Sequence, residues 1–208
     1  MSTAQKDIWL AQKLMPEVPN NSLVVSDVRG PVEAAVMEAA LRRVLAETEV
    51  LRAGFEEGPD GLRQVVHESV DWSPFFADVS GDPDPEAAAR EAAREAARRP
   101  FAFGGEVLFR AGLVTLAADR HFMILVMHHL VTDGFGVFMV LERVAEVYTA
   151  LLRGQAVPET RLTGPEEIYR EDARYLGSDE STADREFWRT YLADAPAAAR
   201  LPGDGGTG

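Results

Sequence analysis

The pattern of hydrophobic and polar residues predicts helices and strands in mixed order. Residues 122–127 form a short continuous apolar run, typical of a strand buried on both faces. Beyond it, apolar residues recur at helical spacing until Gly154 supplies a stop: Val137, Leu141, Val144, Tyr148 and Leu151. Similar patterns predict helices at about 4–14, 32–47, 85–99, 165–175 and 181–192, and strands at 22–28, 51–57, 62–68 and 107–116.

Turn and cap residues connect these segments. Gly58–Gly61 predicts a hairpin between 51–57 and 62–68, and 118–120 joins 107–116 to the apolar run as a second antiparallel pair. Thr3 and Asp84 are the expected caps of the helices that follow them. The order of elements predicts an α/β fold, in which helices pack on a mixed sheet.

Composition narrows the functional classes. The 208 residues, 46% hydrophobic, are enough for one domain with a substantial core. A net charge of −13 argues against nucleic acid or an anionic membrane as partner. There is no cysteine, no secretory signal and no apolar run of membrane length. These features predict a cytoplasmic protein without disulfides.

The candidate chemistry lies in seven residues, His128-His129-Leu130-Val131-Thr132-Asp133-Gly134, between the apolar strand and the next helix. Imidazoles at the end of a buried strand are costly unless they have partners or a task. Because successive strand side chains point to opposite faces, we expect one histidine to face packed structure and the other an opening. Asp133 falls at the turn, where a carboxylate can cap the helix or pair with a cation.

Other readings of these residues are weaker. His128 is more plausibly structural than chemical, and His129 taken alone could equally be a core histidine. A metal site at the histidines and Asp133 is improbable, since adjacent strand residues diverge and His67 and His121 stand at no recognisable ligand spacing. The sequence contains no recognisable Ser–His–Asp arrangement or phosphate-binding loop motif.

The seven residues closely resemble the HHxxxDG signature of condensation domains from nonribosomal peptide synthetases. Other family motifs occur in the family order: Ser2–Trp9 resembles the opening S-x-A-Q-x-R-L/I-W motif, Glu49–Phe55 the second motif, and Pro100–Phe103 the stretch before the signature. Tyr169–Asp172, with Phe187 and Trp188 after it, resembles the fourth motif. The chain is therefore identified as a member of this family, whose fold is that of chloramphenicol acetyltransferase.

The resemblance implies roles for the signature residues. His129 corresponds to the catalytic histidine, with His128, Asp133 and Gly134 supporting it. Two departures matter: Asp7 and Glu47 stand where the family commonly has arginine. Because family members typically neutralise the signature aspartate with an arginine, Arg52 becomes the candidate partner of Asp133.

The resemblance also implies partners and an organisation. Condensation domains have two similar lobes in a V, and residues 1–200 correspond to the N-terminal lobe. The Gly-rich residues 201–208 would begin a flexible inter-lobe linker. The implied partners are donor and acceptor peptidyl carrier proteins, the C-terminal lobe and the adenylation domain. The substrates would arrive on phosphopantetheine arms, with no directly bound cofactor or metal.

The expected function is amide (peptide) bond formation between a carrier-bound acyl or peptidyl thioester and a carrier-bound amine, and one lobe alone is expected to be inactive. Two alternatives remain open at this point. One is an epimerisation domain, which shares HHxxxDG, although the Ala4-Gln5 to Trp9-Leu10 opening favours condensation. The other is a noncatalytic lobe that only docks carrier proteins or a partner subunit.

Overall fold

The computed structural model describes residues 1–59, 61–104 and 107–196. By its internal contacts the chain divides into two compact units, Met1–Glu167 and Ile168–Gly208. The strands are β1 (Asn21–Arg29), β2 (Ala53–Gly58), β3 (Gly61–Val66), β4 (Phe75–Asp78), β5 (Phe109–Ala117) and β6 (Arg120–His128). The helices are α1 (Thr3–Leu14), α2 (Ala34–Glu47), α3 (Pro85–Arg98), α4 (Gly134–Leu152), α5 (Glu166–Leu176) and α6 (Asp179–Tyr191), and a 3₁₀ turn, η1 (Glu49–Arg52), precedes β2.

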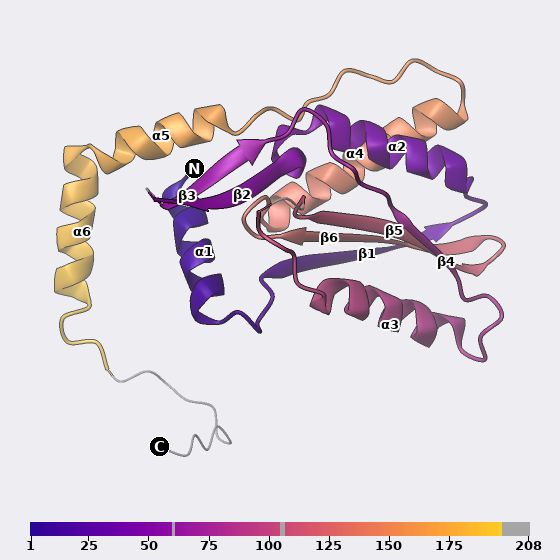
Figure 1. Cartoon of the computed structure of the whole chain (residues 1–208), viewed down its shortest axis with the longest axis horizontal. Coiled ribbons are helices and arrows are strands. Elements are labelled where there is room, and N and C mark those ends of the chain that lie inside the picture. Colours follow the sequence, from indigo (N-terminus) through magenta and orange to yellow (C-terminus); the bar gives the residue numbers. More distant parts are fainter. Residues whose placement is uncertain (60, 105–106, 197–208) are drawn as a thin grey trace. The chain divides into compact units, whose positions relative to one another are not determined.

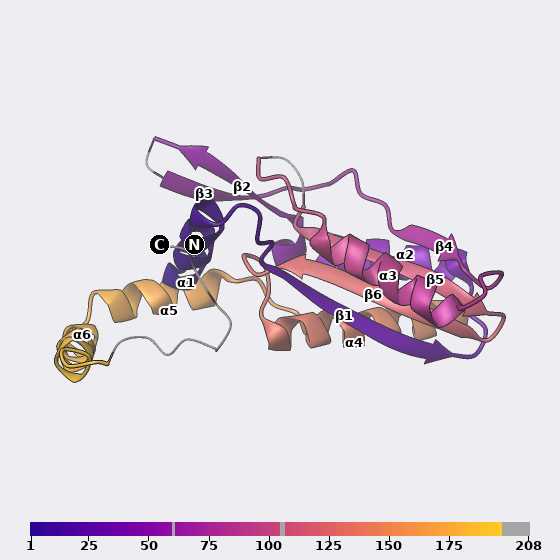
Figure 2. The same ribbon diagram turned by 90° about the horizontal axis from the view of Figure 1, so that it is seen from below.

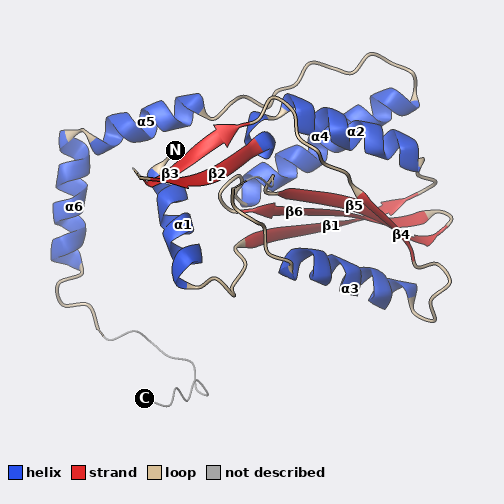
Figure 3. Ribbon diagram, in the orientation of Figure 1, coloured by secondary structure: helices blue, strands red, loops and turns tan. Residues whose placement is uncertain are grey.

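The first unit is built on a four-stranded mixed sheet in the order β1-β6-β5-β4 (Figures 1 and 3). The β1–β6 and β6–β5 pairs are antiparallel, whereas β4 runs parallel to β5. Helix α3 lies on one face, and α2 and α4 pack against each other on the other (Figures 1 and 2). The predicted α/β fold, a mixed sheet with helices packed on it, is confirmed.

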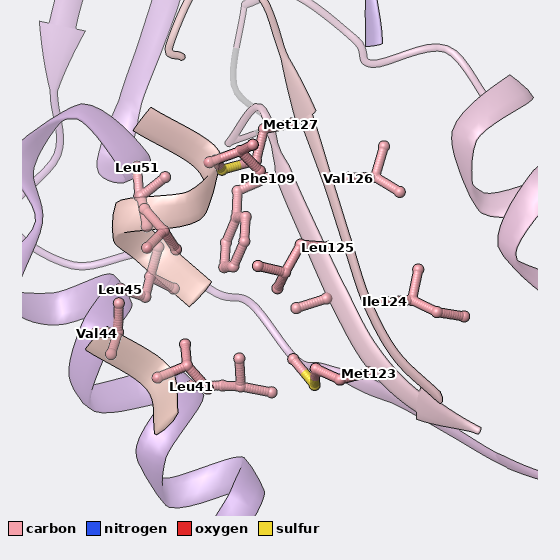
Figure 4. Close-up of a cluster of buried hydrophobic side chains, with 14 of the residues drawn as sticks. Leu41, Val44, Leu45, Leu51, Phe109, Met123, Ile124, Leu125, Val126 and Met127 are labelled. Atoms are coloured by element: carbon pink, nitrogen blue, oxygen red, sulfur yellow. The ribbon is translucent and has the colours of Figure 1, made fainter. Parts of the chain in front are cut away.

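The core is centred on β6, which is buried from His121 to His128. Met123, Leu125 and Met127 face the side chains of α2, while Ile124 and Val126 point to the opposite side of the sheet (Figure 4). Full burial of such a side chain stabilises the fold by roughly 1.5–3 kcal/mol. The unbroken apolar run therefore has its predicted cause: both faces of this strand are covered.

A buried arginine ties α4 to the end of α2. The Arg143 guanidinium, 4% exposed, donates to both carboxylate oxygens of Glu47 at 2.5 and 3.1 Å and to the Pro158 carbonyl at 2.8 Å. Burial alone would raise the pKa of Glu47, but the hydrogen bonds and charge of Arg143 outweigh it and hold that pKa below its usual range. This ion pair fixes the helix that follows the signature residues.

Strand β4 is an element that the sequence pattern did not indicate. Its four residues pair with β5, and Phe75 lies opposite Gly112. A Cβ at Gly112 would come within 2.4 Å of the Phe75 ring, so only glycine allows this close approach. The hairpin β2–β3 forms as predicted, as a separate two-stranded sheet.

One predicted helix cap is wrong. Ser2 caps α1 and Thr3 is already helical, because Ser2 and Gln5 form a capping box: Ser2 Oγ accepts from the Gln5 amide, and Gln5 Oε1 accepts from the Ser2 amide. Asp84 caps α3 as expected, accepting from the Ala87 amide at 3.0 Å.

The second unit contains most of α5 and all of α6. Within it, the Tyr175 hydroxyl donates to Asp184 at 2.7 Å. Along α6, the exposed rings of Phe187, Trp188 and Tyr191 contact one another at centroid distances of 5.4–5.8 Å. The predicted linker 201–208 lies outside the described residues. No helix in the described part of the chain is both long and apolar enough to span a membrane.

Candidate active site

The signature occupies the turn between β6 and α4, and its backbone is held by ladder hydrogen bonds. The His128 amide donates to the Leu108 carbonyl at 3.1 Å, and the His129 amide to the Asn20 carbonyl at 2.9 Å. The pairing of β6 with β1 thus continues one residue past the strand end. Because both neighbouring strands hold the backbone here, the two histidine side chains leave it in fixed directions.

His128 is a buried structural histidine, 2% exposed. Its Nδ1 accepts from the Leu130 amide at 3.1 Å, and Nε2 lies 3.3 Å from Gln12 Oε1, so the proton belongs on Nε2. The rings of Phe101 and Phe103 meet it edge-on. Burial, aided by the nearby charge of His129, lowers the pKa of His128 to about 4. His128 is therefore neutral at physiological pH.

His129 has the opposite environment, because its side chain is exposed. Its Nδ1 lies 3.3 Å from the Thr132 carbonyl and its Nε2 lies 3.1 Å from Ser22 Oγ. A carbonyl only accepts, so the Nδ1 contact requires the proton on that nitrogen. The lone pair of the neutral ring is then on Nε2, directed away from its own loop. The expected division between one packed and one open histidine is what the structure shows.

Asp133 is the N-cap of α4, and its Oδ1 accepts from the Gly136 amide at 2.7 Å. A Cβ at Gly136 would come within 2.7 Å of Thr132 Oγ1 and 3.3 Å of Asp133 Oδ1, so the cap needs a glycine there. Gly134, the first residue of α4, has open space where a Cβ would stand. Gly134 therefore leaves open space beside the signature turn.

The predicted Arg52–Asp133 pair is absent from the structure. Arg52 donates from Nη1 to the carbonyls of His67 and Glu68, which ties η1 to the residues after β3. Asp133 is instead satisfied by its own helix end. A carboxylate that accepts from a helix N-terminus already has a favourable partner, because the helix dipole and the free amide groups lie there.

Two glutamines of α1 form hydrogen bonds to the signature segment. Neither was identified from the sequence as a site residue. Gln5, 8% exposed, donates from Nε2 to the Leu130 carbonyl at 2.8 Å and to Gln64 Oε1 at 3.2 Å. Gln12 contacts His128 and accepts from the Asn20 amide at 3.2 Å. The two are seven residues apart, hence on one face of the helix. The only sequence signal was the presence of Gln5 in the opening motif.

A cavity of about 310 Å³ opens beside His128. Its lining includes Gln12, Asn21, Phe101 and Phe103 but not His129. This cavity therefore lies on the side of the buried His128 and not at the exposed imidazole of His129. Among the residues that the structure describes, no three His, Cys, Asp or Glu residues are placed to hold a metal ion.

Chemically, this arrangement offers an imidazole whose neutral form carries its lone pair on Nε2, which can take a proton once its contact with Ser22 is exchanged for a substrate. Histidine titrates near neutral pH, which suits acid–base chemistry under physiological conditions. Two neighbours orient the ring, and Asp133 and Gly136 fix the helix beside it. The geometry fits proton transfer at a reacting amine or hydroxyl.

Comparisons with known proteins point to one family. The chain is 37% identical over 202 residues to a dimodular nonribosomal peptide synthase of Bacillus subtilis (strain 168), a match covering 97% of the chain and 8% of that protein. It is 34% identical to an isonitrile lipopeptide synthase of Streptomyces coeruleorubidus, covering 96% of the chain and 14% of the relative.

Solved structures give the same result. A starter condensation domain of rhizomide synthetase, crystallised with C8-CoA, superposes with a TM-score of 0.89 at 33% identity, covering 96% of this chain and 47% of that one. The first condensation domain of the calcium-dependent antibiotic synthetase, in complex with a substrate analogue, gives 0.88 at 30% identity, covering 94% and 48%. The chain thus spans about half the length of these solved domains and a small part of the synthetases. The family model described as "Condensation domain" matches residues 1–207, and the chain belongs to the condensation-domain family.

Proposed function

We propose that this chain is the N-terminal, histidine-bearing part of a domain that forms an amide bond between a carrier-bound acyl thioester and a carrier-bound amine. The observation that carries the proposal is the exposed His129 ring, whose Nδ1 contacts a carbonyl acceptor and whose Nε2 contacts a hydroxyl that a substrate can replace, that of Ser22. Family membership supports the reaction class.

The chemistry follows from what aminolysis of a thioester requires. The amine nitrogen attacks the thioester carbonyl carbon and loses a proton, the C–S bond breaks, and the thiolate leaves and is protonated. His129 Nε2 would receive the amine proton and return it to the leaving sulfur. The remaining rate enhancement would come from holding two tethered substrates together.

The exposure of His129 supports the need for a further part of the domain that encloses the substrates from the opposite side, as a second wall of the active site. The His129 side chain is exposed, so substrates held only by this chain would be poorly positioned. We infer that the missing half of the domain supplies the opposite wall, and that peptidyl carrier proteins deliver both substrates on phosphopantetheine. A neighbouring adenylation domain and a cytoplasmic location are part of the same proposal.

The test uses the complete condensation domain that contains this chain. Acyl-CoA thioesters from acetyl to palmitoyl serve as donor probes, and a panel of aminoacyl-N-acetylcysteamine thioesters serves as acceptors, with amide product measured by mass spectrometry. We expect His129→Ala to reduce turnover at least a hundredfold, in line with loss of a general base. His128→Asn is the matched control and should retain a folded, at least partly active enzyme.

Three results would contradict the proposal. The first is no amide product from the wild-type domain with any probe pair, which would favour a docking role. The second is epimerised aminoacyl thioester in place of amide. The third is turnover by His129→Ala close to wild type. The isolated 208-residue chain should give no product, and appreciable turnover from it would overturn the argument for a second wall.

A further inference from the structure

The strand pairing beyond β6 gives His129 a neighbour on β1. Asn21 lies opposite His128 in the antiparallel pair. The His129 amide donates to the Asn20 carbonyl, so Asn20 lies opposite His129. Ser22 is two residues farther along β1 than Asn20, on the same face. It is therefore the diagonal cross-strand neighbour of His129, a position from which side chains can touch.

The contact is made between the two side chains. Ser22 Oγ lies 3.1 Å from His129 Nε2, and Ser22 is half-buried. On the other side of the ring, Nδ1 lies 3.3 Å from the Thr132 carbonyl. With the proton on Nδ1, the Ser22 hydroxyl is the donor and Nε2 the acceptor. An exposed ring is thus held at both nitrogens, by the signature turn on one side and by β1 on the other.

We propose that Ser22 is a positioning residue for His129, an inference that rests on the proposed function. Its hydroxyl keeps the imidazole in the rotamer that presents Nε2 to the incoming amine, and it yields that hydrogen bond when the amine arrives. Without it, the Thr132 contact would be the remaining hydrogen bond from the described residues to an exposed ring, and the ring would spend less time in the productive orientation.

A positioning role predicts a particular kinetic signature. Ser22→Ala removes one neutral hydrogen bond, so kcat should fall about threefold to tenfold. KM for donor and acceptor should stay within about twofold, since Ser22 holds the base and not the substrate. The melting temperature should not change, because the contact lies at the surface. Ser22→Thr restores a hydroxyl on a strand-compatible residue and should recover most of the lost rate.

The chain offers a matched control in Ser26, which lies on the same face of β1, four residues farther along. Its register partner is Met123, well inside β6 and away from the signature turn. Ser26→Ala makes the same chemical change on the same strand and should leave kcat and KM unaltered. All variants are measured in the complete domain with octanoyl-CoA and the aminoacyl-N-acetylcysteamine thioester that the wild type uses best.

Outcomes separate the two proposals. If Ser22→Ala matches the wild type while His129→Ala is inactive, Ser22 has no positioning role and the proposed function stands. If His129→Ala retains wild-type turnover, the proposed function fails first. Mass spectrometry of the protein after incubation with donor alone adds a further check: an acyl group on Ser22 would make it a nucleophile and overturn a positioning role. Failure of Ser22→Thr to recover the rate would also count against it.

Discussion

The side-chain amide of Gln5 donates a 2.8 Å hydrogen bond to the carbonyl of Leu130, 125 residues away in the chain. Gln5 is also half of the capping box that begins α1. One side chain therefore starts the first helix and fixes the middle of the signature turn. In this chain the opening motif is thus physically linked to the HHxxxDG segment.

We expect Gln5→Ala to destabilise the chain by about 1–3 kcal/mol, because it leaves the buried Leu130 carbonyl without that donor. Urea unfolding followed by circular dichroism measures the change. Gln155→Ala is the control, since Gln155 is exposed in the segment after α4 and the same truncation there should cost less than about 0.5 kcal/mol. Equal effects of the two substitutions would show that the Gln5 contact contributes nothing specific.

For Asp133→Ala, loss of the cap should lower stability by about 1 kcal/mol, with no additional ion-pair cost, because Arg52 is bonded elsewhere. Asp84→Ala removes an equivalent cap from α3, far along the chain from the signature. Both variants should lose similar stability in thermal unfolding, but only Asp133→Ala should also slow amide formation in the complete domain. A loss of several kcal/mol at Asp133 would mean that the carboxylate has a buried cationic partner after all.

The lowered pKa of His128 makes the free energy of unfolding depend on pH. Its pKa is about 4 in the folded chain against the ordinary 6.5, so between these values the unfolded chain binds more protons. The contribution of His128 to the free energy of unfolding is fully present above pH 6.5. It is lost as the pH falls towards 4, and the total loss is roughly 3 kcal/mol. His128→Asn keeps an acceptor near the Leu130 amide but cannot titrate. The difference in unfolding free energy between wild type and variant should therefore narrow as the pH falls, and a constant difference from pH 7 to 4 would contradict the assignment.

Arg143 should be far more costly to remove than a surface arginine. Arg143→Met leaves the nearly buried Glu47 carboxylate without its main cation, and we expect a loss of about 3–5 kcal/mol in urea unfolding. Arg63→Met breaks the exposed pair with Glu56 and should cost at most about 1 kcal/mol. If the Glu47→Gln, Arg143→Met double variant is more stable than the Arg143→Met single variant, the cost arises from the uncompensated charge, as the structure indicates.

The amino-acid pattern alone determined the main elements of this fold. A doubly covered strand needs apolar residues on both faces, and residues 122–127 supply them without a break. Amphipathic helices need apolar residues at helical spacing, and α4 shows them. These are local requirements that every segment must meet by itself, so they can be read from the sequence. The unequal roles of His128 and His129 follow from strand geometry in the same way.

Only the tertiary structure decided which residues support the histidines. The Gln5–Leu130, Gln12–His128 and Ser22–His129 contacts each join residues more than 100 positions apart, and their existence depends on strand register and helix placement. Strand β4 escaped the sequence pattern because four residues are too few to show a period. The Arg52–Asp133 pair was predicted from the family resemblance, but an arginine binds whichever acceptors the fold brings to it, and here these are the carbonyls of His67 and Glu68.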